Sequence, residues 1–149
     1  MSIKTAFAIA SLPVLAITPI LHAQSTTQTA QAPSPADALQ GTWEGEEIGG
    51  ESQGKWTMTI TGNTLRLDGP DKVEWYMATF TLPANQTPNQ LQATITDCPQ
   101  PKYVGKSSMA IYKIEDGKLT LVGNRPGVLE VPKDFDGDAA SRRFVFKKS

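Results

Sequence analysis

The sequence is poor in the residues that most often carry enzymatic chemistry. Its 149 residues include one cysteine, Cys98, and one histidine, His22. A disulfide within the chain needs two cysteines, and a structural zinc site needs several cysteines or histidines, so neither is expected. Ser-His-Asp and Cys-His mechanisms need an imidazole, and His22 lies in a segment that we expect to be removed. The sequence therefore predicts a non-enzymatic protein without a cofactor, in which Cys98 is buried and inert.

An excess of charge of one sign is also missing. The chain has 14 Lys and Arg residues and 15 Asp and Glu residues, which gives a formal net charge of −1. Domains that bind nucleic acid usually carry a strong basic patch or a clear excess of basic residues. We therefore expect no nucleic-acid partner.

A long hydrophobic run occurs only at the N-terminus. Lys4 precedes an apolar stretch from Ala6 to Leu21, and Leu21-His22-Ala23 has the small residues of a cleavage site. This order is typical of a secretory signal peptide. A membrane anchor is the alternative, but two prolines interrupt the stretch, which is shorter than the about 20 residues of a spanning helix. We predict that residues 1–23 are a signal peptide and that the protein is exported, to the periplasm or the cell exterior, with no membrane span after cleavage.

The composition changes after the predicted signal peptide. Residues 24–35 are built from Ser, Thr, Gln, Ala and Pro, without a charge or a large apolar group, which predicts a flexible linker. Residues 36–149 have the length of one domain. At its start, Pro35 to Gln40 can form one helical turn with Ser34 as the N-cap.

From Thr42 onward, short runs rich in Thr, Val, Ile and aromatic residues alternate with Gly, Asn, Asp and Pro. Trp56, Met58 and Ile60 alternate with threonines, which is typical of a strand that buries one side. No helical periodicity competes with this pattern. We predict eight strands, at residues 42–48, 55–61, 64–68, 74–82, 91–97, 108–114, 119–123 and 142–147.

Short turns between these strands predict an antiparallel meander. Gly62-Asn63 suits a two-residue hairpin, and residues 115–118 suit a slightly longer one. Such a sheet with no covering helix protects its edges by closing into a barrel. A sandwich is the alternative, and several strands are shorter than the about 9–11 residues of an outer-membrane barrel. The predicted fold is all-β, an eight-stranded antiparallel meander barrel with a short N-terminal helical turn.

Four stretches of the chain resemble a known family. Leu39-Gln40-Gly41-Thr42-Trp43 resembles the opening of lipocalin-like barrels. Residues 60–65, residues 111–121 and the later Pro132-x-x-Phe135 resemble the small extracytoplasmic lipocalin-like domain catalogued as an uncharacterised planctomycete domain. The resemblance covers residues 38–147 and departs from the family pattern between Val122 and Val131. It implies a barrel and export, without an established activity.

The resemblance also implies how the barrel is closed at one end. In lipocalins the tryptophan of the Gly-x-Trp motif packs at the closed end, and an arginine of the last strand lies over its ring. Gly41 and Trp43 match that motif, and both Arg142 and Arg143 lie where the arginine is expected. We predict this structural role for Gly41, Trp43 and Arg143.

A ligand of such a barrel would bind in its lumen. Tyr76 and Phe80 point opposite to Trp75 and Met77, so only one of these two pairs can face inward. An eight-stranded barrel is just wide enough to be filled by its own side chains, so a filled interior and an apolar cavity both remain open. The candidate lining residues are Trp56, Met58, Ile60, Trp75, Met77, Met109 and Ile111.

Two acidic clusters fit solvated loops better than chemical sites. Asp134, Asp136 and Asp138 alternate as in a calcium loop, but the glycine is at the fourth position and Val145 stands where the bidentate Glu is needed. They are therefore weak metal candidates, and we expect no metal site. A second cluster is expected in an exposed hairpin loop, and it consists of Glu44, Glu46, Glu47 and Glu51.

Two functions follow from these patterns. The first is a carrier that binds a small apolar molecule in the lumen of the barrel. The alternative is a protein-interaction or protease-inhibitor-like module, which would contact another exported protein through residues 24–38 and the loops. Small secreted protease-inhibitor barrels have a similar opening, but they usually carry a disulfide that one cysteine cannot form. In either case we expect a monomer.

Overall fold

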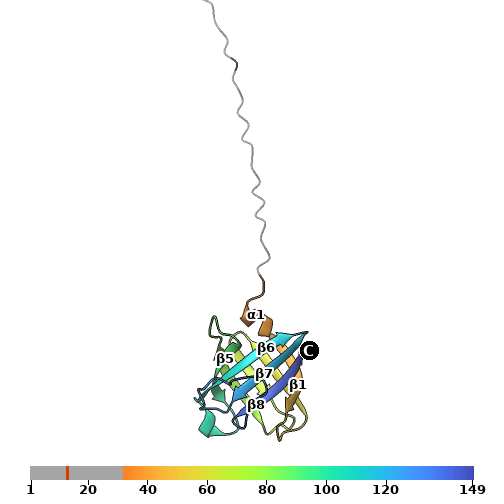
Figure 1. Ribbon diagram of the computed structural model, residues 1–149, viewed down its shortest axis with the longest axis vertical. Helices are drawn as coiled ribbons and strands as arrows, with labels where there is room; N and C mark the ends of the chain where they lie inside the picture. The colour runs from red at the N-terminus through yellow and green to blue at the C-terminus, as the bar shows by residue number, and fades with distance from the viewer. Residues whose placement is uncertain (1–12, 14–31) are drawn as a thin grey trace, which may run out of the picture. The chain divides into compact units, whose positions relative to one another are not determined.

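Eight antiparallel strands follow one another around a closed barrel (Figure 1). The computed structural model describes Pro13 and residues 32–149, and residues 32–149 form one compact unit. The predicted signal peptide, apart from Pro13, and residues 24–31 of the predicted linker lie outside the described residues. The strands are β1 (Gly41–Ile48), β2 (Lys55–Thr61), β3 (Thr64–Asp68), β4 (Trp75–Thr81), β5 (Asn89–Asp97), β6 (Ser107–Glu115), β7 (Lys118–Asn124) and β8 (Ser141–Lys148).

The structure confirms the predicted fold class and all eight strands, with bounds that differ by at most two residues. Closure comes from the pairing of β1 with β8, in which Gly45 lies opposite Phe146. Because every strand has two neighbours, no strand of the barrel presents a free edge. Among the described residues, no helix is both long and apolar enough to cross a membrane.

The short helix α1 (Pro35–Leu39) covers one end of the barrel (Figure 1). Ser34 caps it, because its Oγ accepts from Asp37 N at 3.2 Å while Asp37 Oδ2 accepts from Ser34 N at 3.1 Å. Gln40 then ties the helix to the β2–β3 turn, with Gly62 N donating to Gln40 Oε1 at 2.7 Å. We call this the helix end. The opposite end, the loop end, consists of residues 49–54, 69–74, 98–106 and 125–140. The segment 98–106 includes the 3-10 turn η1 (Pro101–Tyr103).

Aromatic and aliphatic side chains fill the barrel. The Trp56 and Phe144 rings meet edge to face at 5.2 Å, and Phe144 stacks on Phe146 at 5.7 Å. Met58 and Ile60 are buried in the same cluster. All of these interior side chains are almost completely buried and pack against one another, and they do not line the hollows of about 210 and 510 Å³ that lie elsewhere in the described part of the chain. The filled interior is therefore the alternative that the structure supports.

Trp75 and Met77 of β4 were predicted to line the interior, but the strand turns its other face inward. Ala78 and Phe80 are in the core and Tyr76 packs against it, whereas Met77 is 38% exposed. Trp75 also lies on the outer face, where the guanidinium of the exposed Arg66 is 5.3 Å from its ring centroid. Trp75 and Met77 do not line the interior, because alternation along the strand gives the inner face to their neighbours.

Strand β6 is buried on both faces, which explains a second correction. Ala110 and Tyr112 belong to the core, so Met109 and Ile111 face outward although both are buried. The loop 125–140 lies against β6, since Met109 N donates to Val128 O and Lys113 Nζ is 5.0 Å from the Phe135 ring centroid. Met109 and Ile111 therefore pack beneath this loop rather than line the interior.

At the helix end, Lys148 takes the position over the motif tryptophan that was expected for Arg143. Trp43 is buried and donates through Nε1 to Leu39 O at 2.8 Å, while Lys148 Nζ lies 5.3 Å from its ring centroid. Arg143 alternates with the inward-facing Phe144, so it faces outward, and it lies at the loop end of β8. Trp43 packs at the helix end of the barrel, and the cation over its ring is Lys148 instead of Arg143.

The Lys148–Trp43 contact predicts a small effect on stability. Lys148→Met should lower the free energy of unfolding by about 0.5–1 kcal/mol, because it removes a cation–π contact that is open to solvent. Urea denaturation measures this change. Lys147→Met, on the outward-facing neighbour, is the matched control and should change stability by less; an equal loss in both variants would contradict the assignment.

Candidate functional site at the loop end

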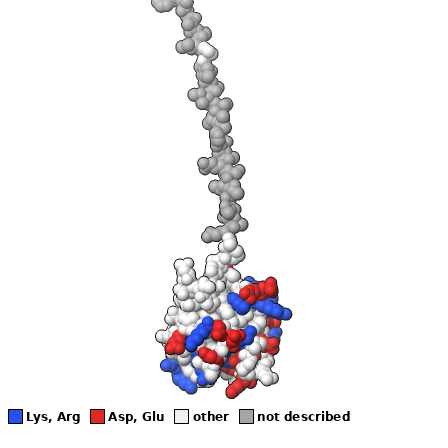
Figure 2. Space-filling model, in the orientation of Figure 1, with Lys and Arg blue, Asp and Glu red and all other residues white. Residues whose placement is uncertain are grey.

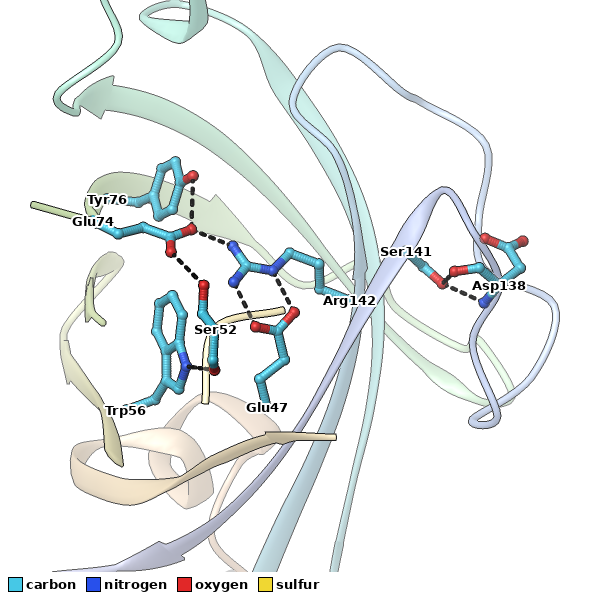
Figure 3. Close-up of polar contacts among 8 residues, drawn as sticks. All are labelled: Glu47, Ser52, Trp56, Glu74, Tyr76, Asp138, Ser141 and Arg142. Carbon is cyan, nitrogen blue, oxygen red and sulfur yellow. Dashed lines mark hydrogen bonds and ion pairs between the residues drawn. The ribbon is translucent and has the colours of Figure 1, made fainter. Parts of the chain in front are cut away.

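A charged cluster crosses the inside of the barrel at the loop end (Figure 3). Arg142 Nε and Nη2 donate to the two carboxylate oxygens of Glu47, each at 2.7 Å. Arg142 Nη1 donates to Glu74 Oε1 at 2.6 Å. One guanidinium thus holds two carboxylates, in the paired geometry that makes such hydrogen bonds strong.

The alternation of two strands brings these side chains together. Arg142 is in phase with the buried Phe144 and Phe146 on β8, so it points into the barrel. Glu47 is in phase with the buried Trp43 on β1 and lies opposite Phe144. A Cβ on Gly50 would overlap the Glu47 carboxylate, so glycine at this position leaves Glu47 room to reach Arg142.

The cluster is largely shielded from solvent. The side chains of Glu47 and Arg142 are 4% and 27% exposed. The Arg142 guanidinium lies 4.8 Å from the Trp56 ring centroid and 5.3 Å from that of Phe144. Burial alone would lower the pKa of Arg142, but the hydrogen bonds and charges of Glu47 and Glu74 outweigh it and raise that pKa. Arg142 therefore stays charged and acts as a fixed cation.

A second set of polar groups fixes Glu74. Ser52 Oγ donates to Glu74 Oε2 at 3.1 Å, and the Tyr76 hydroxyl donates to Glu74 Oε1 at 3.3 Å (Figure 3). Every Glu74 oxygen thus has a donor. Because the two carboxylates converge on one arginine instead of facing each other across an open cleft, the arrangement closes the loop end of the barrel and does not resemble a glycosidase pair.

The environment of Tyr76 predicts how stability depends on alkaline pH. Burial, followed by the nearby Glu74 charge, raises the pKa of Tyr76 above its ordinary value of 10.0. The unfolded chain therefore loses the tyrosine proton at a lower pH than the folded protein, so stability falls as the pH rises above about 10. Urea denaturation of wild type and Tyr76→Phe between about pH 8 and 11 measures this, and the variant should lose less stability. Equal losses of stability in wild type and Tyr76→Phe would show that Tyr76 is not the cause of the alkaline destabilisation.

The hollow of about 210 Å³ lies beside the charged cluster. Its wall includes the turn in which Asp138 N donates to Ser141 Oγ at 2.8 Å (Figure 3) and Ala140 N donates to Asp138 Oδ1 at 2.8 Å. In the described part of the chain, no group of three acidic, cysteine or histidine side chains is placed to hold a metal ion. The aspartates at positions 134, 136 and 138 therefore do not form such a group. The lining residues are Glu47, Ile48, Gly49, Gly50, Asp136, Gly137, Asp138, Ser141, Arg142 and Arg143.

Most of the exposed large aliphatic side chains belong to loops at the loop end of the barrel. Val73 is 73% exposed between β3 and β4, and Leu129 is 63% exposed between β7 and β8. On the face shown in Figure 2, acidic and basic side chains lie among one another instead of forming a patch of one sign. Of the large exposed apolar residues in the described part, Met77 lies on the barrel wall, and the others are at the end of β1 or in the loop-end segments: Ile48, Val73, Val104, Leu129 and Val131.

The sequence and the structure agree on only part of this site. Trp56, Met58 and Ile60 lie inside the barrel, and Trp56 also contacts Arg142. The acidic cluster was expected in an exposed hairpin loop, which is wrong for Glu44, Glu46 and Glu47 because all three lie in β1. The Glu47 side chain is also buried beside Arg142. The inward position of Arg142 could have been found from its phase with Phe144, once the inner face of that strand was known.

Cys98 is buried, in keeping with the expectation for it, and its Sγ donates to Gln100 O at 3.0 Å. The family resemblance drawn from the sequence stays a prediction. Comparison with protein-family models, with curated proteins and with solved structures found no match to this chain.

Proposed function

We propose that the protein is an exported, non-enzymatic barrel that binds another exported protein through its loop end. The observation that carries this proposal is the position of the exposed aliphatic side chains. Val73 and Leu129 come from two different loop-end segments, and both are mostly exposed. Exposed apolar side chains surrounded by polar residues are typical of protein-binding sites, and here they come from several loops at one end of the barrel.

The filled interior supports this proposal over a carrier of apolar molecules. Trp56 and Phe146 are completely buried inside the barrel. An apolar ligand in the lumen would have to displace side chains that already pack against one another, at the cost of their contacts. It would also have to pass the Arg142 salt bridges to Glu47 and Glu74.

The loop end also offers a stable platform for a partner. Glu74 N donates to Asp71 O, and Gly69 N donates to Glu74 O at 2.8 Å, so the loop that carries Val73 is closed by its own backbone. The Arg142 cluster then holds Glu74 to β8. A loop fixed in this way loses little freedom on binding, which favours affinity.

Site-specific photo-crosslinking tests the proposal. Benzoylphenylalanine at Val73 should give a discrete crosslinked protein in cells that make this chain naturally. The matched control is the same group at Met77, which is also apolar and 38% exposed but lies on the barrel wall; it should give none of that product. Equal labelling from the two positions would contradict a site at the loop end.

The purified partner then allows affinities to be compared. Val73→Asp and Leu129→Asp should each weaken binding at least about tenfold, because a buried unpaired carboxylate is costly at an interface, and Met77→Asp should not. Removal of residues 24–31 should leave the affinity unchanged, since α1 begins the barrel at the opposite end. Stoichiometric uptake of cis-parinaric acid with quenching of tryptophan fluorescence would support the carrier instead.

A further inference from the structure

The hollow of about 210 Å³ at the loop end is a second candidate site of recognition, which does not depend on a protein partner. Its wall includes Arg142, which is held by Glu47 and Glu74, and Arg143, which forms no ion pair within residues 32–149. It also includes two carboxylate residues, Asp136 and Asp138, that do not pair with Arg143. We propose that this hollow binds the zwitterionic backbone of a free α-amino acid, with Arg143 holding the carboxylate and the loop carboxylates holding the ammonium group.

Arg143 supplies the proposed contact to the carboxylate of the ligand. Its Nε is buried, and in the described part of the chain it has no hydrogen-bond partner. The ion pairs among the described residues do not include Arg143 either, although those of the adjacent Arg142 do. A buried donor without a partner costs free energy, and a planar guanidinium fits a carboxylate with two parallel hydrogen bonds. Arg143 is therefore suited to a carboxylate that enters the hollow.

The loop carboxylates supply the proposed contact to the ammonium group of the ligand. Asp136 and Asp138 line the same hollow, and no ion pair within residues 32–149 uses either one. Asp138 Oδ1 accepts from Ala140 N, which fixes this carboxylate at the end of its own turn. Carboxylates held in this way attract an ammonium group. They also repel a simple anion, so they favour a ligand that carries both charges.

The shape of the hollow fits a small ligand. Gly137 stands between the two aspartates, and a Cβ there would lie 3.3 Å from Ser141 Oγ and 4.0 Å from Arg143 Cβ. Its missing side chain keeps open the space beside Arg143. A hollow of about 210 Å³ is smaller than the about 300–1,000 Å³ of sites for drug-sized molecules and cofactors. Arg142 is already held by Glu47 and Glu74, so Arg143 is the guanidinium that is left for the ligand.

A titration followed by ¹H–¹⁵N NMR tests the proposal with L-alanine, because the proposed contacts are to the backbone that all α-amino acids share. The amide signals of residues 136–143 should shift to saturation with a dissociation constant of about 1 mM or lower. N-acetyl-L-alanine lacks the ammonium group and L-alaninamide lacks the carboxylate. Each should bind at least about tenfold more weakly than L-alanine.

Matched variants locate the site. Arg143→Gln should weaken L-alanine binding at least about tenfold, whereas Arg125→Gln removes the same charge from an exposed residue of the 125–140 loop and should leave binding unchanged. The dispersion of the amide spectrum shows whether each variant is folded. No saturable shift up to about 20 mM L-alanine would overturn the proposal, as would equal binding of N-acetyl-L-alanine or unchanged binding to folded Arg143→Gln.

Discussion

Arg142→Gln should lower the free energy of unfolding by about 3–5 kcal/mol, because it leaves buried carboxylates without their cation. Glu47 loses both hydrogen bonds from Arg142 while its side chain is only 4% exposed. The Trp56 and Phe144 rings lose the guanidinium that lies over them. Urea denaturation followed by tryptophan fluorescence measures the loss.

A surface ion pair of similar geometry provides the matched control. Arg66 donates through Nε and Nη2 to Asp68, but both side chains are well exposed. Arg66→Gln should therefore cost less than about 1 kcal/mol. Losses of equal size in Arg142→Gln and Arg66→Gln would show that burial of the cluster does not matter.

A combined variant separates the missing cation from the lost packing. Replacing the whole cluster with apolar side chains (Arg142→Met, Glu47→Leu and Glu74→Leu together) leaves no buried charge. Apolar replacements of this kind are often neutral or stabilising. The combined variant should therefore be more stable than Arg142→Gln, and the opposite order would contradict our account of the cluster.

Gly45→Ala should destabilise the barrel by about 3 kcal/mol or more, at or above the upper end of what overpacking usually costs. A Cβ on Gly45 would overlap the carbonyl oxygen of Val145 and lie 2.7 Å from Phe146 Cα. These are backbone atoms of β8, so a change of rotamer cannot relieve the contact. Because β1 and β8 close the barrel, the strands themselves must move apart.

Gly123→Ala is the control for Gly45→Ala. A Cβ at Gly123 would lie 3.6 Å from Ala110 Cβ, an ordinary packing distance. This variant should change the free energy of unfolding by less than about 1 kcal/mol. Chemical denaturation measures both variants, and a similar cost at the two positions would contradict the close approach of β1 and β8.

The strands could be predicted because their sequence signal is local. The alternation of Trp56, Met58 and Ile60 with threonines and the glycine in the following turn fix β2 without knowledge of the rest of the chain. The same logic could not choose the inner face of β4, because both faces carry large apolar or aromatic side chains. Only the packing of the whole barrel decides between them.

The burial of β6 and the charged cluster depend on segments far away in the sequence. Met109 and Ile111 are buried by a loop that follows β7, so their apolar character does not indicate the interior. Glu47 and Arg142 are 95 residues apart in the chain. Each looks like a solvated charge when it is read alone, and only the closure of the barrel makes them neighbours.

The two inward-facing cations of β8 also determine which alignments of this strand are possible. Its inward-facing side chains are Arg142, Phe144, Phe146 and Lys148, so a charged residue stands on either side of the phenylalanine pair. The smallest slip that keeps the same side chains inward is two residues. A slip of that size in either direction would draw Arg142 or Lys148 into the apolar middle of the barrel, where a cation without a partner is costly. The last strand of the barrel can therefore pair with β1 and β7 in one alignment only.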